Sequence, residues 1–597
     1  MNILGIFWGI CSGAALFQKN TLTCAVSEER FTRLKNDDVF PLKSIKYCMT
    51  ALPERVSALD GVAIGSRFQP YWYSVKRKAL WTIDDYVAEQ REFWYPKLIK
   101  GENVWEGSYL RHRIDVEQYP PHFWKKSLES PEIQENFAHQ GRVEITAKAV
   151  GVPYNKVWAI EHHRCHAYYA YYASPYRGEP VLALTIDGWG DDCNATIAIF
   201  ESDGTYHRVF KSVDANIGRI YRYVTLILGM KPNEHEYKVM GLAPYGKEGI
   251  ARKAYEVFRS TLYVDDLEFK WQVRPTDSYF WFKEKLEGCR FDGIAAGLQR
   301  WVEELLCQWV KNAVQQFGIN KVIIGGGVAM NVKAMGEIGR LPCVHSLFVS
   351  GTPADDSLAL GAAYALADDL FRESGKPWSS DRIQCLPHLY LGPEYSREEE
   401  EAAIVTLEPS RYQVKTNFTA AEVAQELVQG KIVARCAGRM EFGARALGNR
   451  SILADPIDTE VVPKINAAIK NRDFWMPFAP LIMDTWEQRY LVNPKQMHSP
   501  HMTVAFPITD IGWRAMPAAC HPADRSARPQ ILHREVNPPV YEILEEFEKL
   551  TGRGALLNTS FNLHGFPIVN TPQDAVAVFE NSGLDIMILN NFFIRKT

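Results

Sequence analysis

The chain has 597 residues, of which 46% are hydrophobic and 23% charged, and its formal net charge is only −4. A chain of this length exceeds a single hydrophobic core, so we expect at least two domains. The near-neutral charge disfavours a nucleic-acid-binding protein, which needs clustered excess Lys and Arg. The eleven cysteines are scattered and none is in CxxC spacing, which indicates reduced thiols and a cytoplasmic protein rather than a disulfide framework or zinc knuckle.

The run 3–17 carries no charge and imitates a targeting signal. It lacks the basic residues that precede a signal sequence, and it is short for a membrane span. We therefore expect no membrane association. The run instead predicts a buried strand, a turn of small residues and a second strand.

The order strand, turn, strand, turn, strand is predicted twice in the first 210 residues. The expected strands are 2–6, 14–17 and 21–26 in the first copy, and 181–186, 195–200 and 206–210 in the second. Two such openings predict a duplicated α/β domain with a cleft between its halves. The actin, hexokinase and acetate-kinase (ASKHA) superfamily is built in this way and binds nucleotide in the cleft.

A candidate metal site combines the sequence EHHRCH at 161–166 with DGWGDD at 187–192. If the Ala/Tyr-rich run 167–173 is helical, His162 and His166 lie at i and i+4 on one face, where two imidazoles can bind one ion. Asp187 ends an apolar run and would project from a strand tip. This donor set suits iron, manganese or zinc. The alternative is a pair of surface histidines on an amphipathic helix.

A Gly-rich turn follows a long predicted helix, 294–317, and a short strand, 321–324. Its residues Gly326, Gly327 and Asn331 are candidates for binding a nucleotide, because glycines let backbone amides approach phosphate or ribose closely. The alternative is tight packing between a strand and a helix.

Asp355 immediately precedes a predicted helix, 358–371. An aspartate at this position is usually a helix cap, and it is also a candidate fourth metal ligand from the second half of the domain. After this helix, the Gly, Pro, Ser and charged residues of 373–386 predict a linker.

The segment after the linker is rich in fixed positive charge. The stretch 438–451, GRMEFGARALGNRS, holds three arginines within twelve residues, and Asn558 to Asn562 adds hydroxyl and amide donors. Further cations in the same part of the chain are Lys470, Arg472 and Arg528. Arginine forks match phosphate oxygens, so we interpret this segment as an oxyanion site. The alternative, a salt-bridged solvent face, favours regular helical charge alternation instead of Gly- and Arg-rich loops.

These motifs match a known family in its order. The matching strings are EERFTR (28–33), HHxxH (162–166), MGLAPYG (240–246), GGGVAMN (325–331), DD with ALGAA (355–363), GRMEFGARALGNRS (438–451), PFAP (477–480) and LNTSFN (557–562). Over nearly its whole length the chain resembles the NodU/CmcH O-carbamoyltransferases. The resemblance implies two domains: residues 1–375, similar to the tRNA threonylcarbamoyl transferase, and residues 388–597, an α/β YrdC-like domain.

The resemblance also implies a two-step reaction. The C-terminal domain would bind carbamoyl phosphate and ATP, with Mg²⁺, and form carbamoyl adenylate. The N-terminal domain would transfer the carbamoyl group to an alcohol at a metal, with Fe²⁺ expected before Mn²⁺ or Zn²⁺. The residues implied as metal ligands are His162, His166, Asp187 and Asp355. Those implied at the carbamoyl phosphate and ATP site are Arg445, Lys470, Arg528 and Ser560, of which Arg445 and Lys470 are expected to be catalytic. Lys35 is expected as a further catalytic residue in the acceptor-side cleft, where it would stabilise negative charge.

Two positions depart from the family pattern. Ile10 and Cys11 stand where the family usually has His-Asp, so the imidazole that would deprotonate the acceptor is missing. Met476 replaces an arginine of the family string FRPFAP. The other basic residues and the metal ligands are complete, which favours an active enzyme of a divergent branch.

The acceptor is expected to be a small molecule with a hydroxyl group, such as a sugar or another natural product. An aromatic insertion at about 66–140 suits stacking on sugar rings, and the alternative is a helical lid or the interface of a homodimer. Two rival functions are a tRNA-modifying transferase, which the charge disfavours, and a catalytically silent ATP-binding regulator, which the Ile10-Cys11 change would fit.

Overall fold

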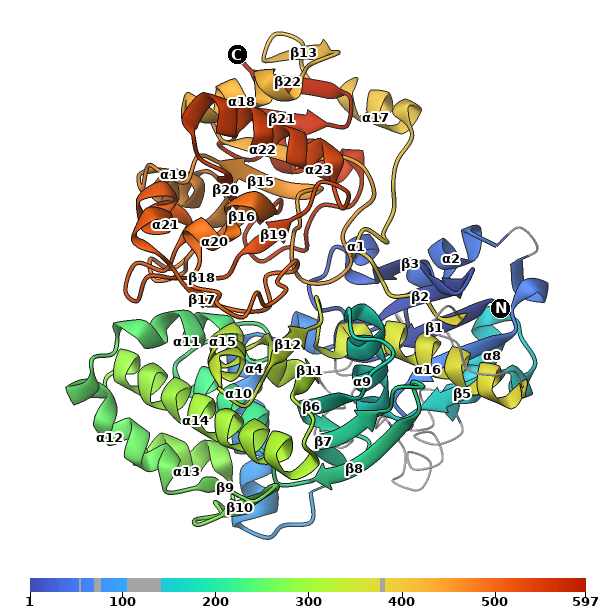
Figure 1. Ribbon diagram of the computed structural model, residues 1–597, viewed down its shortest axis with the longest axis vertical. Helices are drawn as coiled ribbons and strands as arrows, with labels where there is room; N and C mark the ends of the chain where they lie inside the picture. Colours follow the sequence, from blue (N-terminus) through green and yellow to red (C-terminus); the bar gives the residue numbers. More distant parts are fainter. Residues whose placement is uncertain (53–54, 69–76, 105–140, 376–381) are drawn as a thin grey trace. The chain divides into compact units, whose positions relative to one another are not determined.

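The computed structural model describes residues 1–52, 55–68, 77–104, 141–375 and 382–597 (Figure 1). These residues form two compact units, Met1–Leu386 and Pro387–Thr597. Most of the expected aromatic insertion, 69–76 and 105–140, lies outside the described residues, as does 376–381 of the expected linker.

The N-terminal unit contains two five-stranded sheets with the same topology. Each sheet opens with three antiparallel strands, and two further strands then pair in parallel on the other side of the first. The first sheet has the order β3-β2-β1-β4-β5, with β1 Ile3–Phe7, β2 Gly13–Gln18, β3 Thr21–Ser27, β4 Gly61–Gly65 and β5 Val157–Ile160. The second has the order β8-β7-β6-β11-β12, with β6 Val181–Gly190, β7 Cys193–Phe200, β8 Tyr206–Ser212, β11 Lys321–Gly325 and β12 Ser346–Val349.

This repeated topology confirms the duplicated actin/hexokinase-like domain predicted from the sequence. All six predicted opening strands are present, because alternating apolar runs and small-residue turns specify them locally. The uncharged run at the N-terminus forms β1 and β2, as expected, and both strands are buried.

Two helices lie between the sheets. Helix α16 (Leu358–Glu373) packs on β1, β2 and β4, helix α9 (His162–Ala173) packs on β6 and β11, and the two helices contact each other (Figure 1). The contact is so close that a Cβ atom at Gly361 would lie 1.9 Å from the Cys165 carbonyl oxygen. A side chain at this position would force the helices apart, and it would separate the first residues of α9 from those preceding α16.

Helix α10 (Ile217–Ile227) packs on β6, and α12 (Glu248–Arg259) packs on α14 (Phe291–Phe317). Helix α14 confirms the long helix predicted at 294–317. Its apolar residues Leu298, Trp301, Leu305 and Trp309 are buried, as their helical spacing predicted.

The C-terminal unit is built on one mixed eight-stranded sheet of order β13-β22-β21-β14-β15-β20-β16-β19. Its strands are β13 Tyr412–Thr416, β14 Val433–Cys436, β15 Arg450–Ala454, β16 Ala479–Met483, β19 Gln530–Leu532, β20 Ala555–Ser560, β21 Ile586–Leu589 and β22 Phe592–Lys596. Helices α18 (Ala420–Val428) and α22 (Pro538–Thr551) pack together over its core. The α/β class expected for this domain is therefore confirmed.

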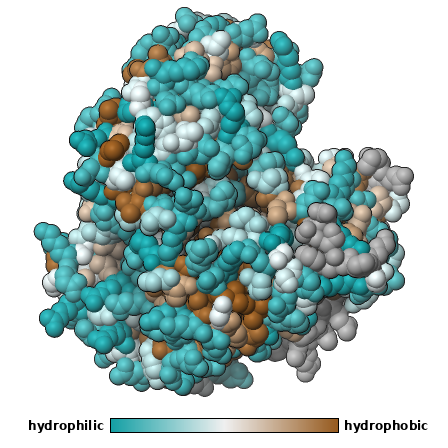
Figure 2. Space-filling view, in the orientation of Figure 1, coloured by the Kyte–Doolittle hydropathy of each residue, from teal (hydrophilic) through white to brown (hydrophobic). Residues whose placement is uncertain are grey.

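Hydrophilic residues cover most of the face drawn in Figure 2, and the hydrophobic ones form small, separate patches. Within the described ranges, no helix is both long enough and apolar enough to cross a bilayer.

Candidate functional site

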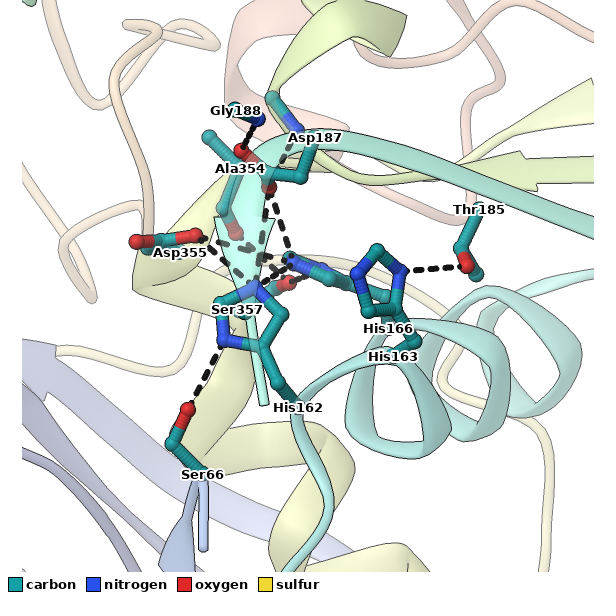
Figure 3. Close-up of polar contacts among 12 residues, drawn as sticks. Ser66, His162, His163, His166, Thr185, Asp187, Gly188, Ala354, Asp355 and Ser357 are labelled. Carbon is teal, nitrogen blue, oxygen red and sulfur yellow. Dashed lines mark hydrogen bonds and ion pairs between the residues drawn. The ribbon is translucent and has the colours of Figure 1, made fainter. Parts of the chain in front are cut away.

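Four side chains of the N-terminal unit converge on one point (Figure 3). One ligand atom from each of His162, His166, Asp187 and Asp355 lies within 4.8 Å of the other three. The two Nε2 atoms are 3.1 Å apart, and the His166 Nε2 lies 3.2 Å from the nearer Asp187 oxygen and 3.7 Å from Asp355 Oδ1. The structure thus brings together all four residues predicted as metal ligands.

Three elements place these residues. Both histidines lie one turn apart in the first turns of α9, whose N-cap Glu161 accepts a hydrogen bond from the Arg164 N–H. Asp187 lies in β6 of the second sheet. Asp355 opens the short 3₁₀ turn Asp355–Ser357 that leads into α16. The donor set therefore depends on the packing of α9 against β6 and α16.

Each histidine is oriented by a serine on its far nitrogen. His162 Nδ1 lies 2.9 Å from Ser66 Oγ, and His166 Nδ1 lies 3.3 Å from Ser357 Oγ. When Nδ1 carries the proton and donates it to the serine, the lone pair of Nε2 points into the cluster. This is the tautomer that a metal-binding histidine needs.

His163, between the two, faces away from the cluster (Figure 3). Its Nδ1 lies 2.8 Å from Thr185 Oγ1, its Nε2 lies 3.2 Å from the Cys193 carbonyl oxygen, and its side chain is fully buried. Burial and the two neighbouring histidines lower the pKa of His163 well below its usual value, so it stays neutral. We interpret it as a structural residue.

Backbone amides fix the Asp187 carboxylate. Oδ1 accepts from the Gly188 N–H at 2.5 Å, and Oδ2 accepts from the Gly327 N–H at 2.8 Å. A Cβ at Gly326, whose φ is +93°, would lie 2.2 Å from the Ile186 carbonyl oxygen. The Gly-rich turn therefore packs tightly against the end of β6 and supports a predicted metal ligand.

Asn331, the third residue predicted to bind nucleotide in this turn, has structural partners. Its side chain caps helix α15 (Val332–Arg340) and forms a pair of amide hydrogen bonds with Gln299. The structure thus gives packing and capping contacts for Gly326, Gly327 and Asn331, and their cofactor role stays a prediction.

The pKa shifts of the cluster show that its two carboxylates favour positive charge beside them. Burial alone would lower the pKa of His162, but a hydrogen bond to Asp187 and the charge of Asp355 raise it to about 9. Burial acts to raise the pKa of Asp187, but the two imidazoles hold it well below its usual value. Two imidazole nitrogens and two carboxylates in this arrangement fit a divalent cation such as Fe²⁺, Mn²⁺ or Zn²⁺.

Lys35 lies near Cys11, and Cys11 lies near Asp355 of the cluster. Lys35 Nζ donates to Glu234 at 3.0 Å, and Glu234 also pairs with Lys231 at 2.9 Å. Glu234 therefore pairs with two ammonium groups, and the charge of Glu29 also acts on Lys35. Burial raises the pKa of the Cys11 thiol well above its usual value, as do the charges of Asp356, Glu29 and Asp355. Cys11 therefore stays a neutral thiol.

A cluster of positive charge lies in the C-terminal unit. Burial lowers the pKa of Arg528 well below its usual range, and the charges of Arg445 and Arg472 lower it further. The loop of Arg445 is tied to the strands beside it, because Asn558 donates to the Ala446 carbonyl and Gln530 donates to the Leu447 carbonyl. The structure thus brings the predicted phosphate residues Arg445 and Arg528 together, with Arg472 beside them.

Lys470 and Ser560 form a second pair. The Lys470 ammonium donates to the Ser560 hydroxyl at 3.1 Å and to the Asn562 side-chain oxygen at 2.7 Å, and it also contacts the Ser560 carbonyl. These bonds join the end of the short helical turn Asn466–Lys470 to the end of β20. A role for Lys470 in catalysis stays a prediction.

Two arginines of the predicted oxyanion motif have other partners. Arg439 donates to the Leu391 and Gly392 carbonyls, and Arg450 donates to several backbone carbonyls, among them that of Gly438 at 3.0 Å. The motif therefore contributes Arg445 to the basic cluster and uses its other two arginines to hold the loop. Met476 is buried, so it supplies apolar packing where the family has an arginine.

The sequence interpretation missed the residues that support the ligands. Gly190 lies flat against the His162 ring, where a Cβ atom would come within 2.2 Å of its Cγ. Asp356, next to Asp355, is buried, and its Oδ1 has no hydrogen-bond partner among the described residues. Of these supporting residues, Gly190, the second glycine of DGWGDD, was the one that the sequence could have indicated. A serine or a second aspartate occurs in no distinctive pattern.

Fold and site together define a two-domain α/β protein with a candidate metal centre in one domain and a candidate anion site in the other. Two family models match the chain, "Carbamoyltransferase N-terminus" over residues 2–364 and "Carbamoyltransferase C-terminus" over residues 424–596. The chain therefore belongs to the carbamoyltransferase family, of the NodU/CmcH type, and is a transferase enzyme.

Several relatives match most of the chain. An uncharacterized protein of Methanocaldococcus jannaschii is 30% identical over 100% of both chains. Nodulation protein NolNO of Sinorhizobium fredii is 27% identical, over 98% of this chain and 78% of its own. The 3′-hydroxymethylcephem-O-carbamoyltransferase of Amycolatopsis lactamdurans is 27% identical, over 74% of this chain and 81% of its own. The resemblance inferred from the motifs is thereby confirmed.

Proposed function

We propose that the protein is an O-carbamoyltransferase that uses carbamoyl phosphate and ATP. The C-terminal unit forms carbamoyl adenylate, and the N-terminal unit transfers the carbamoyl group to a hydroxyl of a small molecule. The observation on which the proposal depends is the convergence of His162, His166, Asp187 and Asp355 within 4.8 Å in a chain of the carbamoyltransferase family.

In the N-terminal unit, His162, His166, Asp187 and Asp355 would hold a divalent cation. When bound, this cation supplies Lewis-acid chemistry, which polarises an oxygen of the carbamoyl group or of its phosphate leaving group. Ser66 and Ser357 keep the two imidazoles in the binding tautomer, and the amides of Gly188 and Gly327 hold Asp187 in place. Lys35 adds a fixed positive charge near the acceptor side, where negative charge develops as the hydroxyl attacks.

In the C-terminal unit, Arg445, Arg472 and Arg528 would bind the phosphate groups of carbamoyl phosphate and ATP. Three guanidinium groups that repel one another are stabilised when a phosphate lies among them. Water cleaves carbamoyl phosphate to carbamate and phosphate, and the carbamate oxygen then attacks the α-phosphorus of ATP and displaces pyrophosphate. The loop that follows β20 is supported by the contacts of Lys470 with Ser560 and Asn562. Just before this loop, the Asn558 side chain holds the loop of Arg445.

The proposed acceptor is a sugar or another natural product with a free hydroxyl. Support comes from the similarity to the 3′-hydroxymethylcephem-O-carbamoyltransferase, whose name specifies a hydroxymethyl acceptor, and to nodulation proteins.

The test is an assay of pyrophosphate release from labelled ATP by the full-length protein with carbamoyl phosphate. We expect pyrophosphate only when both substrates are present. Addition of a hydroxyl acceptor should then yield a carbamate ester, detected by a mass increase of the acceptor. Failure to release pyrophosphate under any metal condition would contradict the proposal.

A further inference from the structure

Ser66 has an unusual backbone conformation next to the candidate metal centre. It follows β4 with φ at +76°, in the left-handed region that side chains other than glycine rarely adopt, and it is buried. Glycine would fit this conformation without strain. The serine therefore keeps a hydroxyl at a position where the backbone alone favours glycine.

The Ser66 hydroxyl forms a hydrogen bond with His162 Nδ1, at 2.9 Å (Figure 3). The two residues are 96 positions apart in the chain, and the hydrogen bond is buried. It lies on the side of the imidazole opposite the nitrogen that faces Asp187 and Asp355.

Asp191 fixes both partners of this hydrogen bond. Its carboxylate accepts from the backbone N–H of Arg67 at 2.6 Å and of Phe68 at 2.7 Å, directly after Ser66. It also accepts from the backbone N–H of His162 itself at 2.7 Å. Asp191 can do this because it occupies a two-residue hairpin turn between β6 and β7, in which both residues have positive φ.

Arg142 holds the segment from the other side. Its guanidinium donates to the Ser66 carbonyl at 2.9 Å and to the Gly65 carbonyl at 3.3 Å, and its side chain is buried. The strained residue is thus held through its own carbonyl and through the two amides that follow it.

We infer that Ser66 is a positioning residue for the metal centre, held in a strained turn by Asp191 and Arg142 so that its hydroxyl fixes the orientation and tautomer of His162. This inference rests on the proposed function, because it requires that the cluster binds a metal. Residues in this role typically change metal affinity by about tenfold to a hundredfold when they are removed.

The experiment is a titration of the metal-free, full-length protein with Co²⁺, followed by its visible absorption. Ser66→Ala removes the hydroxyl and retains the strain, whereas Ser66→Gly removes both. We expect each variant to bind Co²⁺ about tenfold to a hundredfold more weakly than the wild type, with a shifted spectrum. Ser174→Ala is the matched control. Ser174 is a buried serine at the other end of α9, and its hydroxyl donates to the Tyr171 carbonyl and accepts from the Tyr176 amide.

Thermal unfolding without metal separates this role from a structural one. The unfolding midpoint of Ser66→Gly should exceed that of Ser66→Ala, because both variants lack the hydroxyl and only glycine relieves the left-handed strain. Equally weakened Co²⁺ binding in two variants of different stability would identify the hydroxyl as the cause. Wild-type affinity and spectrum in Ser66→Gly would overturn the inference and leave the metal site standing. Absence of Co²⁺ binding in the wild type would overturn both.

Discussion

The candidate metal centre attracts positive charge, whereas the arginine cluster of the C-terminal unit repels it. In the first, Asp187 and Asp355 raise the pKa of His162 to about 9. In the second, Arg445 and Arg472 help to lower the pKa of Arg528. Each group of side chains is therefore arranged for a ligand of opposite charge, a cation in one unit and an anion in the other.

The two sites can therefore be separated by mutation. They share no residue, and each lies in a compact unit with its own sheets and core. A substitution that removes the cation site should leave the anion chemistry intact, and the converse should also hold.

His166→Ala should abolish metal binding and carbamoyl transfer while pyrophosphate release continues. The imidazole supplies one of four converging donor atoms, and its loss leaves two carboxylates facing a single histidine. Metal content after purification and the two partial reactions are the measurements. His207→Ala, on an exposed position of β8, is the control. Normal metal content in His166→Ala would refute the ligand assignment.

The metal-free protein should lose stability as the pH rises from about 6.5 to about 9. The pKa of His162 in the folded protein is raised above its ordinary value of 6.5, so the folded state binds this proton more tightly than the unfolded state. The stabilisation from His162 is complete below pH 6.5, is lost through pH 9, and amounts to roughly 3 kcal/mol. The raised pKa of His166 acts in the same direction. Thermal unfolding at several pH values is the measurement, and a midpoint that rises across this window would contradict the electrostatic account.

Arg528→Ala and Arg445→Ala should each slow pyrophosphate release by tenfold or more and leave metal content unchanged. Charge-assisted hydrogen bonds to phosphate contribute about 2 to 3 kcal/mol. Arg397→Ala serves as a control because Arg397 is exposed, pairs with Glu401 and lies over the ring of Phe592. Rates near that of the wild type in both cluster variants would exclude a phosphate role for these arginines.

Gly190→Ala should weaken metal binding and lower the unfolding midpoint. The new methyl group would lie within 2.2 Å of the His162 ring, so the ring must move away from the cluster. Such overpacking costs about 1 to 3 kcal/mol. Gly188→Ala is a sharp comparison two residues earlier, since its Cβ would meet nothing within 4 Å. Equal metal affinity in the two variants would show that the contact with His162 is unimportant.

The parts of this molecule that could be predicted from the sequence are those that local patterns specify. The opening strands of both sheets and helix α14 follow from apolar periodicity, and the four converging residues follow from an i, i+4 pair, a strand end and a helix start. The order of the eight-stranded sheet does not follow, because β14 pairs with β21 across about 150 residues and no local signal specifies the partner.

The residues that support the two sites could not be predicted from the sequence either. Ser66 meets His162 only because the turn after β4 and the start of α9 are brought together by Asp191. In the oxyanion motif, sequence spacing grouped Arg439 and Arg450 with Arg445, although the first two hold backbone carbonyls. Spacing identifies charged residues, and tertiary structure decides which of them face a ligand.

Cys11→Ser should retain most of the transfer activity, and Ile10→His should not lower it. Cys11 occupies the turn in which the family has a histidine, but its thiol contacts Asn36 and its pKa is raised well above the usual value by burial and by Asp356, Glu29 and Asp355. A neutral thiol is a poor proton acceptor near neutral pH, so the turn supplies packing and no base. The measurement is transfer from preformed carbamoyl adenylate to a sugar alcohol at several pH values. Loss of transfer in Cys11→Ser, with folding and metal content retained, would identify Cys11 as the base and refute the packing interpretation.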